Sequence, residues 1–336
     1  MKKMSIIITV GIIARNEEEN ISNTLKNVLN QSFDTGSYEV IVVDGNSEDN
    51  TREIATKILD SSRVKHKVLN EANFGFYGHC FARNLVIDNS DNNSRYIAFT
   101  DADCTVDKNW LSTLYNAVNG TDDTIAGGGG PRLISETDNK IELVINAFLT
   151  TFLSSGGNPA FFKSDVKYVN SIANYNAMYK KNIISKFRYD DKLIMSDDNE
   201  LNFRIRSAGY RFINIPDARV WHRETNSIRE FAGNMYNYGW NITNTVKKHG
   251  NYVTVNVPLT VTFILYLIIL LPSYFFQGPV VFIPLLLYLI FALAVFIEVT
   301  INTRTIYSLI ILILLPVQHI SYGLGVIFNL FSCKKV

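Results

Sequence analysis

The chain lacks several features that would mark common classes of protein. Its formal net charge is only +1 at pH 7. It therefore has no basic excess to neutralise phosphates, and we expect no nucleic acid as a partner. Its three cysteines stand far apart without the spacing of a zinc site, which favours free thiols in a reducing compartment. Neither a Gly-x-Gly-x-x-Gly fingerprint nor a Gly-x4-Gly-Lys-Ser/Thr loop occurs, which argues against classical dinucleotide-binding folds and P-loop enzymes.

Charged residues nearly disappear beyond about Gly250, where long aliphatic and aromatic runs begin. Three runs approach or exceed the roughly 20 apolar residues of a membrane-spanning helix. They are Val253–Leu271, Val280–Val299 and Ile306–Phe331. The sequence therefore predicts an α/β domain over residues 1–250 and a transmembrane region over residues 251–336. A very hydrophobic soluble helical subdomain is the alternative.

Basic residues beside these runs favour one orientation. Lys247 and Lys248 precede the first run and Arg304 lies between the second and third. Basic residues are enriched in cytoplasmic loops, which predicts a multi-pass protein of the cell membrane with its N-terminal domain on the cytoplasmic side. The lysines after the third run break this rule if all three runs span. That run contains Pro316 and Gly323, so a kinked or re-entrant helix is also open.

Apolar segments rich in β-branched residues alternate with segments of helical periodicity in the first hundred residues. The expected strands are Ser5–Ile13, Tyr38–Val43, Val64–Leu69 and Tyr96–Thr100, and the expected helices are Glu19–Leu29, Arg52–Leu59 and Gly78–Ile87. This order predicts a mostly parallel sheet with helices on both faces.

Charged residues follow three of the expected strands. Arg15, Asp44 and Asp101 all come where a strand ends. Ligands of such sheets lie beyond the carboxyl ends of the strands. The triplet Asp101-Ala102-Asp103 can converge on a hard divalent cation that holds a diphosphate group, although such a triplet is also common in solvated turns.

A glycine-rich run, Gly127–Gly130, follows a short expected strand over Asp123–Ala126. A tight turn would explain the run, and so would a close approach of the backbone to a ligand. Both interpretations stay open.

Six short motifs occur in a fixed order between residues 4 and 240. They are Ile13–Glu18, Val43–Thr51, Ala82-Arg83-Asn84, Asp101-Ala102-Asp103, Ser196–Leu201 and Arg204–Tyr210. The ordered set resembles the inverting family 2 glycosyltransferases of the GT-A fold, with the last two motifs similar to that family's E-D-x-E-L and R-x-R-x-x-G-Y signature. The membrane tail resembles the subgroup that builds surface polysaccharides or lipid-linked glycans.

The resemblance implies an α/β nucleotide-diphospho-sugar transferase fold with C-terminal transmembrane helices. It also implies hexosyltransferase-type activity, a nucleotide-diphospho-sugar donor and Mg²⁺ or Mn²⁺. Asp103 is then the expected metal ligand. The expected donor-binding residues are Ala14, Arg15, Glu17, Asp44, Arg83, Asp101 and Ala102. His222, after a strand-like stretch, is a further candidate for a metal or phosphate contact, and a structural histidine is an equal alternative.

The same resemblance makes Asp198 the expected general base for an acceptor hydroxyl. Asp197 stands where the family more often has Glu, so the choice between the two carboxylates stays open. Asp198 precedes a helical pattern over Leu201–Ala208, and a helix N-terminus favours the ionised form of a carboxylate. The alternative is that both residues only cap the helix.

The sequence thus predicts a membrane-anchored, metal-dependent inverting glycosyltransferase with a polyprenyl-linked saccharide as acceptor. A polyprenyl-phosphate sugar synthase, in which a lipid phosphate attacks the donor, is one alternative. A non-catalytic membrane protein that keeps the fold as a binding or assembly module is another.

Overall fold

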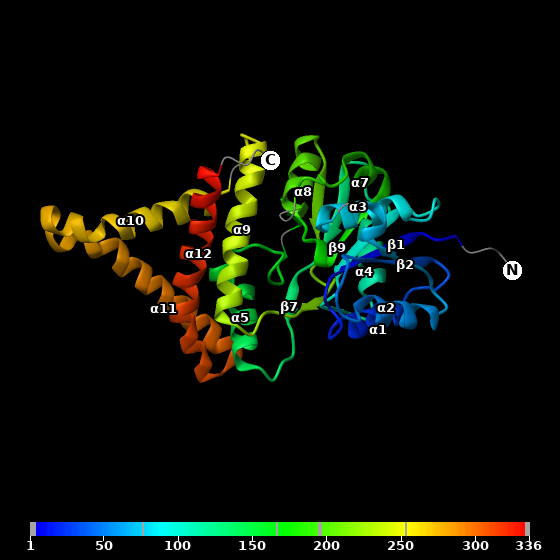
Figure 1. Cartoon of the computed structure of the whole chain (residues 1–336), viewed down its shortest axis with the longest axis horizontal. Helices are drawn as coiled ribbons and strands as arrows, with labels where there is room; N and C mark the ends of the chain where they lie inside the picture. The colour runs from blue at the N-terminus through cyan, green and yellow to red at the C-terminus, as the bar shows by residue number, and fades with distance from the viewer. Residues whose placement is uncertain (1–4, 76, 166, 194–196, 253, 333–336) are drawn as a thin grey trace. The chain divides into compact units, whose positions relative to one another are not determined.

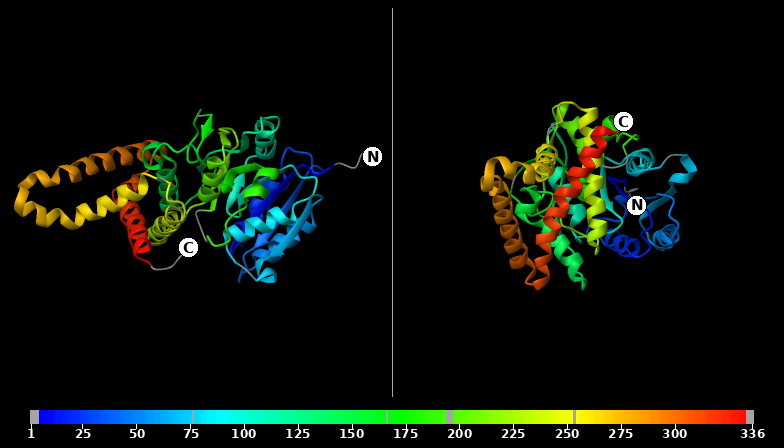
Figure 2. Two further views of the ribbon diagram at one scale, coloured as in Figure 1. Left: turned by 90° about the horizontal axis from the view of Figure 1, so that it is seen from above. Right: turned by 60° about the vertical axis from the view of Figure 1, so that its left-hand side comes forward.

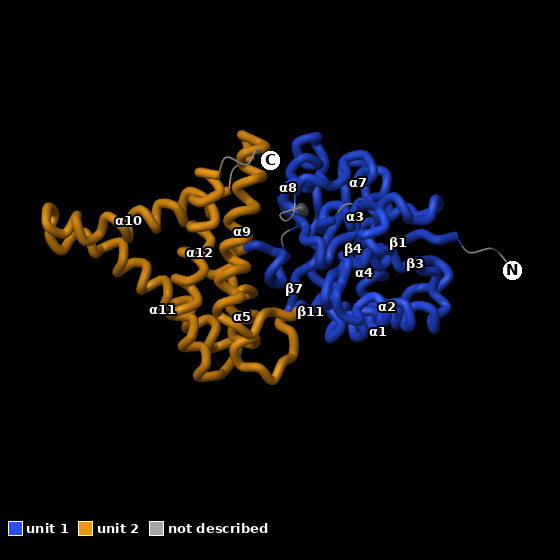
Figure 3. The backbone as a smooth tube through the Cα atoms, viewed as in Figure 1, with its two compact units in different colours: residues 1–133, 158–222 blue, residues 134–157, 223–336 orange. Residues whose placement is uncertain are grey.

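The computed structural model describes residues 5–332 apart from 76, 166, 194–196 and 253, and of residue 197 it describes only the backbone. By its internal packing the chain divides into two compact units (Figure 3). Unit 1 holds residues 1–133 and 158–222, and unit 2 holds residues 134–157 and 223–336. The change of composition near Gly250 and the change of packing at His222 therefore mark different boundaries.

Unit 1 is built on an eight-stranded sheet with the strand order β3-β2-β1-β4-β9-β6-β10-β8. The strands are β1 (Ile8–Ala14), β2 (Tyr38–Asp44), β3 (Lys65–Asn70), β4 (Tyr96–Asp101), β6 (Ile125–Gly129), β8 (Tyr168–Val169), β9 (Ala177–Lys180) and β10 (Arg211–Asn214). Strand β9 runs antiparallel to β4 and β6, and β8 runs antiparallel to β10. The other pairs described are parallel, which confirms the mostly parallel sheet predicted from the sequence.

Helices cover both faces of this sheet (Figures 1 and 2). One face carries α1 (Ile21–Leu29), α2 (Thr51–Asp60) and α4 (Trp110–Val118), and the other carries α3 (His79–Asn89), α7 (Lys181–Phe187) and α8 (Asp197–Ser207). Side chains of β2 alternate accordingly, because successive residues of a strand point to opposite faces. Val40 and Val42 join the first core, and Ile41 and Val43 join the second.

A second, three-stranded sheet has the order β5-β11-β7. Its strands are β5 (Cys104–Val106), β11 (Val220–His222) and β7 (Arg132–Ile134). The buried side chain of Asn176 fixes the backbone just before β7 and just before β11. Its amide nitrogen donates to the carbonyls of Pro131 (3.1 Å) and Ala218 (2.7 Å), and its carbonyl oxygen accepts from Trp110 Nε1 (2.8 Å).

The glycine-rich run lies mostly within a strand, so the tight-turn interpretation is wrong for Gly127–Gly129. These residues form β6 between β9 and β10. A Cβ on Gly127 would lie 2.2 Å from the Met178 carbonyl oxygen, and one on Gly129 would lie 2.5 Å from that of Asn176. The backbone approach that glycine permits is therefore to neighbouring parts of unit 1.

Unit 2 is helical. Its helices are α5 (Lys140–Thr150), α6 (Phe152–Ser155), α9 (Ile228–Lys248), α10 (Asn256–Gln277), α11 (Ile283–Thr303) and α12 (Ile311–Phe331), with the short 3-10 turns η3 (Gly278–Phe282) and η4 (Ile306–Ile310). The three predicted apolar runs correspond to α10, α11 and α12. Two stretches, Asn256–Thr303 and Ile306–Phe331, are long and apolar enough to cross a membrane, and η3 interrupts the first.

The closest helix packing in unit 2 joins α9 to α12, which lie side by side (Figures 1 and 2). A Cβ on Gly239 of α9 would lie 2.0 Å from the Tyr322 carbonyl oxygen of α12. In the reverse direction, a Cβ on Gly325 of α12 would lie 2.1 Å from the Tyr236 carbonyl oxygen. Only glycine allows the two backbones to approach so closely.

This packing predicts opposite effects for the same substitution at two positions of α9. Gly239→Ala should lower the thermal unfolding temperature of the purified protein in detergent, because overpacking of this kind costs about 1–3 kcal/mol. Gly233→Ala is the matched control, since in the described part of the chain its new Cβ would meet no atom within 4 Å outside its own stretch of helix. It should leave stability unchanged or raise it by about 0.5–1 kcal/mol. Equal melting temperatures for the two variants would contradict the described packing.

Candidate active site

The Asp101-Ala102-Asp103 triplet lies between two strands, at the carboxyl edge of the large sheet. Asp101 ends β4 and Cys104 begins β5. The turn is fixed from α1, because the Thr24 hydroxyl lies 2.7 Å from the Ala102 carbonyl oxygen and 2.8 Å from that of Cys104. Ala102 is buried, so it offers little surface for direct contact with a ligand.

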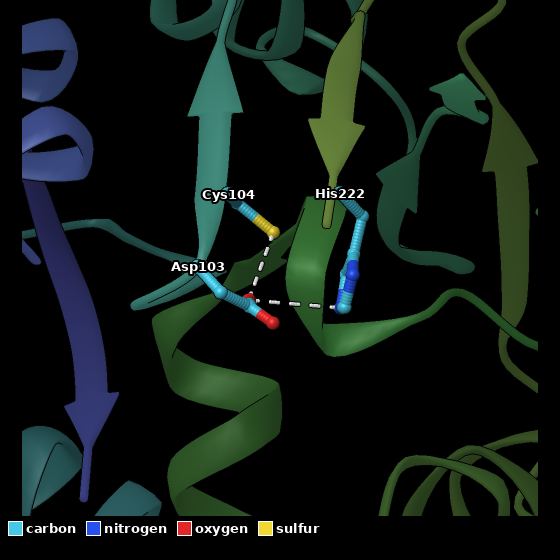
Figure 4. A group of neighbouring side chains, drawn as sticks. All are labelled: Asp103, Cys104 and His222. Atoms are coloured by element: carbon cyan, nitrogen blue, oxygen red, sulfur yellow. Dashed lines mark hydrogen bonds and ion pairs between the residues drawn. The ribbon is translucent and has the colours of Figure 1, made fainter. Parts of the chain in front are cut away.

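Strand pairing brings His222 to this triplet. Strand β11 runs antiparallel to β5, and Cys104 is the direct partner of His222. The Asp103 Oδ1 atom therefore lies 3.7 Å from His222 Nε2, and the Cys104 thiol lies 3.7 Å from the same oxygen (Figure 4). The side chains of Asp103 and His222 are 25% and 18% exposed, so both are accessible to a ligand.

Donor atoms of Asp103, Cys104 and His222 lie within 4.8 Å of one another, which is close enough to hold one metal ion. Burial raises the pKa of the Cys104 thiol well above its usual range, so its thiolate form is disfavoured. The carboxylate of Asp103 and the imidazole of His222 are the better ligands. One oxygen donor and one nitrogen donor would fit a divalent ion such as Mn²⁺.

Glu17, one of the predicted donor-binding residues, lies near enough to the triplet for its charges to act on it. Burial raises its pKa, and the negative charges of Asp103 and Asp101 act in the same direction. A hydrogen bond from Asn20 and the nearby His222 oppose this effect. Glu17 therefore contributes to a concentration of acidic groups that a cation would relieve.

Arg83 forms an ion pair with Asp101. Its guanidinium lies 3.2 Å from Asp101 Oδ1 and about 6 Å from the centres of the Phe99 and Tyr189 rings. Arg83 is buried whereas the Asp101 side chain is 30% exposed. Arg83 therefore orients the carboxylate of Asp101 from its buried side.

Asp44 lies at a different place along the same edge. It ends β2, pairs in register with Ala14 of β1, and accepts a hydrogen bond from the Ser47 amide at 3.3 Å. Strand β1 separates β2 from β4, and Asp44 and Arg15 both act on the pKa of the buried Glu71. The predicted donor residues thus form two groups, one around Asp44 and one around Asp101 and Asp103.

Asp198 lies in the first turn of α8, as the sequence predicted. Its Oδ1 accepts a hydrogen bond from the Asn199 amide at 2.7 Å. Asp197 begins the helix, but its side chain lies outside the described residues, as does Ser196.

Two residues of this site were missed by the sequence analysis. The ring of Tyr175 meets that of His222 edge-on at 5.5 Å, and its hydroxyl donates to the Ala160 carbonyl at 2.7 Å. Burial raises the pKa of Tyr175, and Asp198 and Asp101 add to this while the buried Arg132 opposes it. Arg132 had one sequence signal, its place just after the glycine-rich run, whereas nothing in the sequence marks Tyr175.

Comparison with known proteins identifies relatives of this chain. The sequence profile described as "Glycosyl transferase family 2" matches residues 9–200. Glycosyltransferase AglE of Haloferax volcanii is 33% identical over 121 residues, covering 36% of this chain and 38% of that protein. The probable glycosyltransferase YdaM of Bacillus subtilis is 28% identical, covering 65% of this chain and 50% of that protein. The chain thus spans half or less of the length of these two relatives.

A third relative matches over more of its own length. It is the dolichyl N-acetyl-alpha-D-glucosaminyl phosphate 3-beta-D-2,3-diacetamido-2,3-dideoxy-beta-D-glucuronosyltransferase of Methanococcus voltae, 25% identical, covering 69% of this chain and 71% of that protein.

The fold also has a solved counterpart. Mannosyltransferase PcManGT from Pyrobaculum calidifontis, determined in complex with GDP-Man and Mn²⁺, superposes with a TM-score of 0.59 at 17% identity. The match covers 97% of this chain and 88% of that protein. The GT-A fold predicted from the sequence is therefore confirmed. With more than half of its length matched by the family profile, the chain belongs to glycosyl transferase family 2.

Proposed function

We propose that this protein is a metal-dependent inverting glycosyltransferase that moves a sugar from a nucleotide-diphosphate donor to a hydroxyl group of a membrane-associated acceptor. The observation that carries the proposal is the Asp103–His222 pair beside Asp101. The charges of Asp198 and Asp101 both raise the pKa of Tyr175, whose ring meets that of His222, which supports a role for Asp198 near the proposed metal ligands.

Asp103 and His222 are the proposed metal ligands. A bound divalent ion would offset the negative charge that develops on the departing diphosphate. Arg83 keeps Asp101 in place through their 3.2 Å ion pair, and Tyr175 restricts the ring of His222. Because one ligand is an imidazole nitrogen, we expect Mn²⁺ to support the reaction better than Mg²⁺, which prefers oxygen ligands.

Asp198 is the proposed general base. Inversion requires a carboxylate that receives the proton of the acceptor hydroxyl on the face of the sugar opposite the leaving group. Its place in the first turn of α8 favours the ionised form, because the N-terminal end of a helix carries a partial positive charge. Asp197 is the other candidate for this role.

A lipid-linked saccharide is the proposed acceptor, at the cytoplasmic face of the cell membrane. Two large apolar side chains at the C-terminal end of α10 are almost fully exposed in the protein alone, Phe275 at 83% and Phe276 at 87%. Burying them in a bilayer is favourable. The Methanococcus voltae relative is named for a dolichyl phosphate-linked saccharide, which supports the same class of acceptor here. Lys247, Lys248 and Arg304 support the orientation.

Metal dependence is the first test. Purified full-length protein in detergent is assayed with a panel of nucleotide sugars and a polyprenyl-linked saccharide. We expect chelation to abolish transfer and Mn²⁺ to restore it more fully than Mg²⁺. His222→Ala should lower kcat/KM by about tenfold or more and reduce the preference for Mn²⁺. The control is His66→Ala, whose ring pairs with Asp60 on α2, outside the site. Transfer that is indifferent to chelator would rule out the metal-dependent mechanism.

Substitution of the base is the second test. Asp198→Asn should lower kcat by about 10²–10⁴-fold, because general-base assistance is lost while the side chain keeps its size. Asp217→Asn, at an exposed ion pair with Lys163, is the charge-matched control and should retain activity. A substantial residual rate for Asp198→Asn would instead favour a polyprenyl phosphate as the attacking group, since a phosphate needs little base assistance. If no donor is consumed under any condition, the protein is a binding or assembly module.

A further inference from the structure

Glu71 is a buried carboxylate that the proposed mechanism does not use. It follows β3 directly, as the first residue of the 3-10 turn η1 (Glu71–Phe74). Asn70 is the register partner of Asp44, so Glu71 lies one residue beyond the end of β2, at the same edge of the sheet. Glu71 is only 2% exposed.

The two carboxylate oxygens of Glu71 differ in their hydrogen bonding. Oε1 accepts a hydrogen bond from the Gly78 amide at 3.1 Å. For Oε2 the described part of the chain offers no hydrogen-bond donor. Oε2 lies over Gly45, where a Cβ would come within 3.4 Å of it and within 3.2 Å of the Arg15 Cβ. The absence of a side chain at Gly45 keeps a space open between the ends of β1 and β2.

The charges facing Glu71 come from the neighbouring strand ends. Burial raises the pKa of Glu71 to about 7, and Asp44 acts in the same direction. Arg15, which follows β1, and the Gly78 amide, which precedes α3, act in the opposite direction. Two buried carboxylates side by side, one with an unused oxygen, are unfavourable without a partner. A ligand that presents several N–H groups would satisfy both.

We propose that Asp44 and Glu71 together read the base of the donor nucleotide and select guanine. Asp44 and Glu71 would divide between them the ring N1–H and the exocyclic N2 amino group. The inference rests on the proposed function, because it assumes that a nucleotide-diphosphate donor binds along this edge.

Guanine is the base whose hydrogen-bonding edge best matches two acceptors. Its N1–H and N2 amino group place adjacent donors on one edge, whereas uracil has a single N3–H between two carbonyl oxygens. A second ionised carboxylate next to uracil would therefore face an oxygen and repel it. Protonated Glu71 loses this discrimination, because it can donate to a uracil carbonyl.

Titration calorimetry with GDP and UDP on the full-length protein in Mn²⁺ tests the proposal. We expect GDP to bind about tenfold to hundredfold more tightly than UDP, in keeping with charge-assisted hydrogen bonds in a buried site. Glu71→Gln should weaken GDP binding by about tenfold and leave UDP binding unchanged or improved. The matched control is Glu53→Gln, an exposed position on α2, which should change neither.

The ratio of the two affinities in the unmodified protein gives a second measurement that needs no variant. Because the pKa of Glu71 is raised to about 7, the preference for GDP should grow between about pH 6 and about pH 8.5, as the carboxylate ionises. GDP and UDP carry the same diphosphate, so titration of the phosphate groups affects both affinities equally and leaves their ratio unchanged. Tighter binding of UDP than GDP, or an equal effect of Glu71→Gln on both, would overturn the inference. Transfer from a uridine-diphosphate sugar would then leave the proposed function intact, whereas failure to bind either nucleotide would overturn both.

Discussion

The antiparallel pairing of β5 with β11 is the interaction on which the candidate active site depends. It places His222 opposite Cys104 and so brings an imidazole to the carboxylate of Asp103. The buried side chain of Asn176 stabilises this pairing. Its amide nitrogen donates hydrogen bonds to the carbonyls of Pro131 and Ala218, just before β7 and β11. A buried amide with all these partners is favourable only in this one arrangement, because any other leaves polar groups without hydrogen bonds.

The large sheet then distributes the rest of the site along its carboxyl edge. Asp101 on β4 lies beside the candidate metal ligands Asp103 and His222. Asp44 lies two strands away on β2, beside Glu71. In the proposed function the donor carries a diphosphate between its base and its sugar, so that its two ends would occupy these two places. The proposed function and the further inference therefore describe two ends of one extended ligand along the strands β2, β1 and β4.

Unit 2 shows how polar residues are accommodated among long apolar helices. Helix α9 contains many polar residues, yet it packs most closely against the apolar helix α12, through Gly239 and Gly325. Similarly, Glu298 in the apolar helix α11 accepts hydrogen bonds from the amides of Phe152 (2.8 Å) and Leu153 (3.2 Å), at the start of α6. A carboxylate in an apolar helix is tolerated because it satisfies otherwise unpaired backbone groups.

Local patterns in the sequence by themselves determined the alternating strands and helices, the apolar helices α10 to α12, and the place of Asp44, Asp101, Asp103 and Asp198 at strand and helix ends. They did so because periodicity and helix or strand boundaries depend on near neighbours in the chain. Only the tertiary structure decided that β9 enters the sheet antiparallel, that the glycine-rich run is a strand, and that His222, Tyr175 and Glu71 meet the predicted residues. Pairing between distant strands is made by backbone hydrogen bonds that every residue type except proline can form, so it leaves no mark on the sequence of either strand.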